Sequence, residues 1–168
     1  MPCKVTHFFH YHQIFTVFSL ISHFLCIFAA ENENDKEKGT HHRIMEKKRT
    51  TPEFVTDLHP GEVFVFGSNL EGMHGGGAAL IAYRKFGAIW GQGVGLQGQS
   101  YGIPTMQGGV ETIRPFVDEF IAFAKQHPEL TFLVTRIGCG IAGFRNEEIS
   151  PLFEAAHDVE NIVLPPGW

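Results

Sequence analysis

The sequence predicts an α/β fold, a three-layer α/β/α sandwich around a mostly parallel central sheet. Short apolar segments bounded by turn residues are typical of strands buried on both faces, and they cover residues 63–66, 101–105, 131–137 and 161–164. Longer segments between them follow helical periodicity over residues 76–86, 112–127 and 147–157. Because strands alternate with helices, we expect parallel pairing and right-handed crossovers.

The remaining segments are predicted from their turn residues. Residues 51–60 are expected to form an irregular lead-in, or a short edge element around Phe54 and Val55. Residues 88–90 are predicted as a short strand. The glycine- and glutamine-rich residues 91–100 are predicted as a loop.

The helices have recognisable ends and faces. The helix over 76–86 ends with Arg84 and Lys85, whose positive charges suit a helix C-terminus. The helix over 112–127 is expected to bury one apolar face, formed by Phe116, Phe120, Ile121 and Phe123.

Residues 1–44 differ in composition from the rest of the chain. Residues 14–30 are almost continuously apolar and are followed by a charged run over 31–38. The stretch fits a signal peptide or membrane anchor, folded structure, or translated upstream sequence, since Met45 opens an ordinary cytosolic start. We favour the last interpretation, which leaves residues 45–168 as one domain that does not contact a membrane.

Composition narrows the function classes. A net charge of −5 argues against a basic face that binds nucleic acid directly. Cys139 is the single cysteine within residues 45–168, and the spacing of the cysteines suggests neither a disulfide framework nor a metal site. This favours a reducing, cytoplasmic compartment and predicts neither a metal nor an organic cofactor.

Two glycine-bearing loops follow apolar strands of the predicted sheet. The first covers residues 67–79 and contains three consecutive glycines; the second covers residues 138–144. In an open α/β sheet, ligands bind beyond the carboxyl ends of the strands. Glycine lets backbone amides approach an anion closely, and a helix N-terminus adds positive potential. The two loops therefore predict a phosphate-bearing ligand.

These loops resemble those of macrodomains, the ADP-ribose-binding superfamily. Ser68–Ala79 resembles the first ligand loop of that family, in which an asparagine after a strand precedes a glycine-rich helix start. Arg136–Phe144 is similar to the second loop, which wraps the phosphates, and in particular to that of the branch with an Ile-Gly-Cys-Gly motif, which includes bacterial proteins. The resemblance covers residues 62–165 and implies a trimmed version of the six-stranded macrodomain sheet.

The resemblance implies a set of ligand contacts to ADP-ribose or a related nucleotide diphosphate, either free or carried by an ADP-ribosylated macromolecule. Asn69 would bind the ribose hydroxyls beside the reactive C1″, and Phe144 would stack on the distal ribose. For the adenosine end, Asp57 is the nearby candidate. The implied contacts are Gly67, Ser68, Asn69, Gly75, Gly76, Gly77, Gly138, Cys139, Gly140, Ile141, Ala142, Gly143 and Phe144.

Several of these residues have structural interpretations as well. Asn69 can cap a turn, Phe144 can be a core residue, and Cys139 can be a small packed residue rather than a reactive thiol. His74 is a candidate proton donor or acceptor, but a solvated loop histidine is the interpretation we favour. The Gly-x-Gly-x-x-Gly pattern at residues 93–98 does not open a helix, so it does not predict a dinucleotide fold.

The sequence leaves binding and catalysis as open alternatives. Active hydrolases of the resembled branch use a lysine after the middle strand and an aspartate in the second loop, and the matching residues here are Met106 and Ala142. Removal of ADP-ribose by that route is therefore disfavoured. Hydrolysis by a positioned water, assisted by Asn69 or His74, stays open. The competing interpretation is a non-catalytic α/β scaffold that binds another ligand or a protein partner.

Overall fold

A computed structural model describes residues 48–168, which form one compact unit. The interpretation of residues 1–44 falls outside the described residues. Within residues 48–168, no helix has both the length and the apolar character needed to cross a membrane.

The described unit is built on a mixed sheet of five strands in the order β2-β3-β1-β4-β5. β1 lies at the centre and pairs in parallel with β3 and β4, β4 pairs in parallel with β5, and β2 runs antiparallel at the edge. The carboxyl ends of β1, β3 and β4 therefore meet at one edge of the sheet. The strands are β1 Glu62–Ser68, β2 Gly95–Gln97, β3 Ser100–Pro104, β4 Thr131–Val134 and β5 Ile162–Val163.

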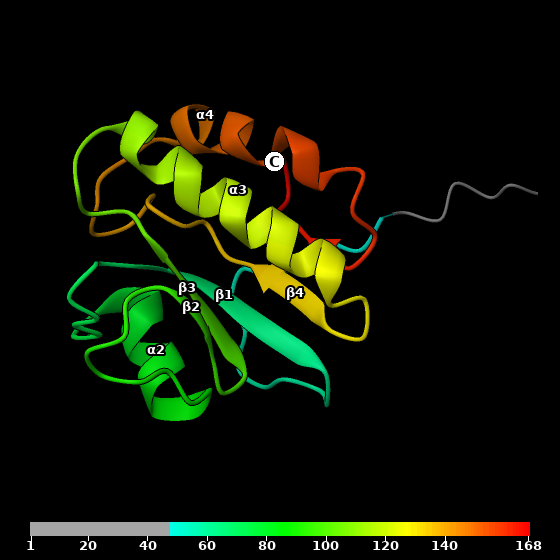
Figure 1. Cartoon of the computed structure of the whole chain (residues 1–168), viewed down its shortest axis with the longest axis horizontal. Helices are drawn as coiled ribbons and strands as arrows, with labels where there is room; N and C mark the ends of the chain where they lie inside the picture. Colours follow the sequence, from blue (N-terminus) through cyan, green and yellow to red (C-terminus); the bar gives the residue numbers. More distant parts are fainter. Residues whose placement is uncertain (1–47) are drawn as a thin grey trace, which may run out of the picture. The chain divides into compact units, whose positions relative to one another are not determined.

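Helices cover both faces of this sheet (Figure 1). α2 lies on one face, and α3 and α4 lie on the other. The bounds are α2 Gly77–Lys85, α3 Val110–Gln126, α4 Asn146–Ile149 and the 3₁₀ helix η1 Ser150–Ala156.

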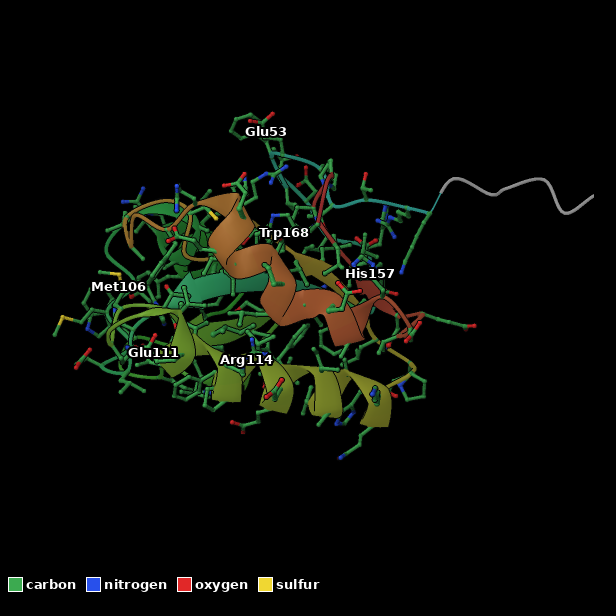
Figure 2. The ribbon with its side chains drawn as sticks, turned by 90° about the horizontal axis from the view of Figure 1, so that it is seen from above. Glu53, Met106, Glu111, Arg114, His157 and Trp168 are labelled. Carbon is green, nitrogen blue, oxygen red and sulfur yellow. The ribbon has the colours of Figure 1, made fainter. Side chains whose placement is uncertain are left out.

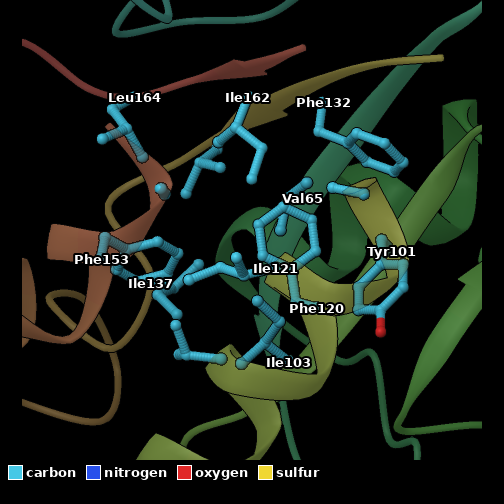
Figure 3. Close-up of a cluster of buried hydrophobic side chains, with 14 of the residues drawn as sticks. Val65, Tyr101, Ile103, Phe120, Ile121, Phe132, Ile137, Phe153, Ile162 and Leu164 are labelled. Atoms are coloured by element: carbon cyan, nitrogen blue, oxygen red, sulfur yellow. The ribbon is translucent and has the colours of Figure 1, made fainter. Parts of the chain in front are cut away.

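β1 contributes side chains to both hydrophobic cores, because successive side chains of a strand point to opposite faces of the sheet. Val63 and Val65 belong to the larger core, under α3 and η1, whereas Phe64 and Phe66 belong to the smaller core, under α2. Figure 3 shows the larger core, in which aromatic and branched side chains from β1, β3, β4, α3 and η1 interlock. The smaller core is completed by Ala79, Ala82, Phe86 and Ala88.

Several predicted boundaries were wrong. Residues 88–90 form a loop, because the N–H of Ala88 donates to Ala82 O and that of Ile89 to the side chain of Gln97. Residues 51–60 form an irregular lead-in, as predicted, whereas the predicted loop over 91–100 contains β2.

The predicted helix over 147–157 and the strand over 131–137 also differ from the structure. The helix is a short α4 followed by η1, because Pro151 lacks the N–H needed to continue α-helical bonding. β4 ends at Val134, and the chain then turns tightly, with Ile137 N donating to Thr135 O at 2.7 Å.

Candidate phosphate-binding site

The two glycine-bearing loops line one cavity of about 430 Å³. It lies at the carboxyl ends of β1, β3 and β4, and we call it the glycine-loop cavity. Its volume lies within the range of small-molecule sites. The lining consists of Gly67, Ser68, Asn69, Met73, Gly75, Gly76, Gly77, Ala78, Ala79, Trp90, Thr105, Met106, Thr135, Arg136, Ile137, Gly138, Gly140, Ile141 and Ala142.

Most of the residues selected from the sequence line this cavity. The structure brings together Gly67, Ser68, Asn69, Gly75, Gly76, Gly77, Gly138, Gly140, Ile141 and Ala142. The two loops also touch each other, because Cδ1 of Ile141 lies 3.0 Å from the position that a Cβ would take at Gly76. Residues of both predicted loops therefore line one cavity.

The N-terminus of α2 presents backbone amides to the cavity. Gly76 precedes the helix in an extended conformation, and among the described residues no side chain caps the helix there. The first N–H groups of a helix have no partner within the helix, and they carry its positive partial charge. Gly77 has φ +56, a left-handed conformation that favours glycine. Because Gly77, Ala78 and Ala79 line the cavity, its wall is suited to an anion.

Arg136 is the one charged side chain of the lining within residues 48–168. Its Nη1 donates to Asn146 Oδ1 at 2.7 Å, and its Nη2 donates to the carbonyl of Pro166 at 2.6 Å. These bonds use two of the five guanidinium N–H donors. The exposed side chain is thus held in place with donors left for a phosphate. Arg136 belongs to the predicted second loop but is not among the contacts predicted from the sequence.

The hydroxyl groups of the lining are committed to the protein itself. Thr135 Oγ1 donates to Val65 O at 2.8 Å, and Thr105 Oγ1 lies 3.4 Å from Ser68 O. Ser68 Oγ donates to the carbonyl of Gly93. These bonds join the strand ends and the neighbouring loop, so the hydroxyls act mainly in shaping the cavity. Ligand donors therefore come from backbone amides and Arg136.

Asn69 braces its own loop. Its Nδ2 donates to the carbonyl of Met73 at 2.9 Å, and its Oδ1 accepts from the N–H of Met73 at 2.9 Å. The turn-capping interpretation of Asn69 thus describes its side chain in this structure. Asn69 still lines the cavity, but both polar ends of its amide are engaged by Met73.

His74 is a buried residue, so its interpretation as a solvated loop histidine was wrong. It is 0% exposed, does not belong to the cavity lining, and packs against Phe66 with ring centroids 5.3 Å apart. Its Nε2 lies 3.1 Å from the carbonyl oxygens of Ile89 and of Gln92, which identifies Nε2 as the protonated nitrogen. Nδ1 has no hydrogen-bond partner within residues 48–168. This placement separates His74 from the cavity and contradicts its predicted catalytic role.

Cys139, Gly143 and Phe144 do not line the cavity, contrary to prediction. Phe144 packs against the larger core, and its ring lies beside Gly138. The Cys139 thiol donates to Asn146 Oδ1 at 3.6 Å. Burial raises the pKa of this thiol, an effect that nearby Arg136 opposes and Glu147 and Glu148 reinforce. The packed-residue interpretations of Cys139 and Phe144 are therefore the ones that the structure favours.

The segment over residues 93–98 serves the fold. Gly95–Gln97 form β2, whose antiparallel pairing with β3 starts at Gly95 and Gly102. Gln97 is 3% exposed; its Oε1 accepts from Ile89 N, and its Nε2 donates to the carbonyl of Gln92. These contacts hold the loop between α2 and β2 beside the first glycine loop.

A second cavity of about 370 Å³ adjoins the first. Thr135 and Arg136 line both cavities, so they form the wall between them. We call this second space the proline-lined cavity, because its lining is Thr51, Pro52, Glu53, Val134, Thr135, Arg136, Pro165 and Pro166. Glu53 is an exposed member of this lining and lies at the periphery of the molecule (Figure 2). Asp57, the residue suggested for adenosine, is exposed and belongs to neither lining.

No protein-family model, curated protein or solved structure matches this chain.

The residues that the resemblance aligned with catalytic groups do reach the glycine-loop cavity. Met106 follows β3 and lies at the periphery of the molecule (Figure 2), and Ala142 lies in the second loop; both line the cavity. Their side chains are a thioether and a methyl group, which hold no proton to transfer and provide no amine to attack a sugar. The described lining is thus equipped to hold an anion through amides and a guanidinium.

Proposed function

We propose that this protein binds ADP-ribose or a related nucleoside diphosphate ligand in the glycine-loop cavity. The observation that carries the proposal is the convergence of both glycine-bearing loops, the uncapped start of α2 and Arg136 on one cavity. The first loop with the start of α2 and the second loop with Arg136 lie about 60 residues apart in the sequence, and all of these groups can donate hydrogen bonds to one anion.

The diphosphate would lie between the two loops. Backbone N–H groups at the start of α2 would donate to one phosphate, and the loop from Gly138 to Ala142 would wrap the other. Arg136 would add charge-assisted bonds from the guanidinium donors that remain free.

The adenosine end would enter the proline-lined cavity. Arg136 lines both cavities. The nucleoside of a diphosphate bound beside Arg136 in the first cavity can therefore extend into the second. Pro52, Pro165 and Pro166 provide apolar surface for a planar base, and Glu53 provides a carboxylate that can accept from an exocyclic amine.

The loop resemblance and the arrangement of the sheet support a finer assignment of the fold, a macrodomain-like three-layer sandwich. The sheet is mostly parallel and carries helices on both faces. We extend the proposal to a cytoplasmic protein whose partner is ADP-ribose, either free or attached to a macromolecule.

Binding is the activity that the described residues support, ahead of removal of ADP-ribose. Met106 and Ala142 replace the lysine and aspartate that the resemblance implies for catalysis. Asn69 is engaged by Met73, and His74 is buried outside the lining. A scaffold that binds a protein partner instead of a nucleotide remains the competing function, and a ligand titration separates the two.

The test is calorimetric titration of the full chain with ADP-ribose, with AMP and ribose-5-phosphate as partial ligands. We expect micromolar binding of ADP-ribose and weaker binding of either half. Arg136→Ala should weaken ADP-ribose about 10- to 100-fold, the effect of removing hydrogen bonds to a charged group. Arg114→Ala is the matched control, because Arg114 is exposed on α3 and outside both cavities (Figure 2).

Absence of heat and of thermal stabilisation with folded protein would refute nucleotide binding and favour the scaffold. Equal losses in Arg136→Ala and Arg114→Ala would refute the assigned role of Arg136.

A further inference from the structure

The mouth of the glycine-loop cavity is apolar. Four large hydrophobic side chains line the cavity while remaining half exposed or more: Met73 at 58%, Trp90 at 54%, Met106 at 50% and Ile141 at 74%. A contiguous exposed apolar surface usually marks a binding site. Because the same cavity holds the anion-binding amides, its ligand is expected to combine phosphate with an apolar or aromatic part.

Trp90 stands out among these four because its loop is rigidly held. Nε2 of the fully buried His74 bonds the carbonyls on either side of Trp90, those of Ile89 and Gln92, at 3.1 Å each. The buried Gln97 accepts from the N–H of Ile89 at 2.6 Å. Gly91 N donates to Gly72 O at 3.0 Å, which ties the loop to the first glycine loop. The side chain of Trp90 is therefore exposed, while hydrogen bonds fix the backbone on either side of it.

The indole itself is held by its neighbours without being covered by them. The ring of Tyr83 lies 5.7 Å away at an interplanar angle of 68°, and that of His74 lies 6.4 Å away at 78°. These near-perpendicular contacts orient the indole, and neither neighbour lies flat upon it. A pre-oriented aromatic ring loses little freedom when a second ring stacks on it.

We propose that Trp90 is a stacking platform for a second planar ring, so that the preferred ligand is a dinucleotide rather than ADP-ribose. The inference rests on the proposed function: the diphosphate occupies the glycine loops and the adenosine the proline-lined cavity. The distal ribose then carries a heterocyclic ring toward the mouth, where Trp90 receives it. NAD⁺ has this chemistry, and its cationic nicotinamide ring is suited to an indole face.

The test compares NAD⁺ with ADP-ribose by calorimetry on the full chain and on two variants. A single base–aromatic stack predicts that NAD⁺ binds roughly 5- to 150-fold more tightly than ADP-ribose. Trp90→Leu keeps an apolar side chain but removes the ring, so it should weaken NAD⁺ binding more than ADP-ribose binding and abolish the preference. Trp90→Phe should retain part of the preference. Ile89→Ala is the control, because Ile89 is 53% exposed beside Trp90 but does not line the cavity.

A fluorescence measurement covers the case in which the leucine variant does not fold. In the Trp168→Phe protein, where Trp90 is the remaining tryptophan, NAD⁺ should quench the emission and ADP-ribose should leave it nearly unchanged. Equal quenching by both ligands would overturn the proposal.

The outcomes separate this inference from the proposed function. If ADP-ribose binds and NAD⁺ binds no more tightly, the platform is refuted while the proposed function stands. If neither ligand binds, both are refuted. A preference for NAD⁺ that survives in Trp90→Leu would also overturn the role of Trp90.

Discussion

The guanidinium of Arg136 is held by the side chain of Asn146, with Nη1 and Oδ1 2.7 Å apart. The same oxygen accepts from the indole N–H of Trp168 at 3.1 Å and from the Cys139 thiol. Trp168 lies beside α4 and η1 and packs on Phe153 (Figure 2). The position of the cation in the cavity is therefore set by the C-terminal helical segment.

Asn146→Ala should weaken ADP-ribose binding roughly 2- to 10-fold, because Arg136 loses one of the bonds that orient it. Calorimetric titration measures the effect. Asn161→Ala is the control: Asn161 Nδ2 donates to three backbone carbonyls away from the cavity, so its loss should lower stability with affinity unchanged. Similar affinity losses in the two variants would show that Asn146 acts only through the fold.

Alanine at two glycines should reduce ligand affinity without reducing stability. An added Cβ at Gly75 or Gly140 meets nothing within 4 Å, and both residues line the cavity. The new methyl groups would occupy ligand space and hold the phosphates away from the amides, so we expect affinity losses of about tenfold or more. Thermal unfolding should be unchanged to within about 2 °C.

Gly93→Ala is the contrasting variant, because its Cβ would lie 1.9 Å from the carbonyl oxygen of Asn69. The backbone must move to accept it, and we expect a loss of several kcal/mol, on the order of the whole stability of a small domain. A stable Gly93→Ala protein would contradict the packing of these two loops. Unchanged ligand affinity in both Gly75→Ala and Gly140→Ala would contradict the cavity as the binding site.

Asn69→Ala should destabilise the first glycine loop, because two hydrogen bonds with Met73 disappear. We expect a loss of about 1 kcal/mol in the free energy of unfolding and a lower affinity for ADP-ribose. Asn69→Asp keeps an acceptor for Met73 N but cannot donate to Met73 O, and its negative charge opposes a phosphate. Its affinity loss should exceed that of Asn69→Ala. Chemical denaturation and calorimetry measure both quantities, and the reverse order would argue against an anion near Asn69.

Glu62 should make the stability of the domain depend on pH. Burial alone would raise the pKa of Glu62, but the N–H of His59 and the ion pair with Arg49 lower it below its ordinary value. A lowered folded-state pKa means that the stabilisation is present above the unfolded value of about 4.3 and is lost as pH falls through the folded pKa.

Glu62→Gln should therefore be less stable than the natural protein by about 1 kcal/mol at about pH 7, with the difference closing near pH 3. Guanidinium unfolding at the two pH values tests this. Arg49→Gln should reproduce part of the effect, since it removes the ion pair and leaves the bond from His59. A difference that persists at low pH would mean that packing of Glu62, rather than its charge, is responsible.

Patterns local in the sequence predicted most of the secondary structure. β1, α2, β3 and α3 lie where apolar periodicity placed them, because each buries an apolar face or stripe whose spacing is visible in the chain. The errors occurred where a distant partner decides the conformation. Residues 88–90 are a loop because the N–H of Ile89 donates to the side chain of Gln97 instead of to a neighbouring strand. β2 forms because residues 95–97 pair with β3.

In the candidate site, too, local sequence patterns predicted some residues, and contacts between distant segments decided the others. Glycines after two strands were sufficient to predict both walls of the cavity, because the carboxyl ends of parallel strands meet at one edge of a sheet. The residues missed include Arg136, Trp90 and Thr105, which reach the cavity through the turn after β4, a braced loop and the end of β3. Their side chains carry no local signal that points toward a cavity.

The sequence by itself determined the α/β class and the positions of the two loops after strands. Tertiary structure alone decided that His74 is buried, that Asn69 binds Met73 and that Asn146 orients Arg136. The physical reason is the range of the interactions. Periodicity and turn chemistry act between neighbours, whereas burial and hydrogen-bond partners depend on which distant segments the completed sheet brings together.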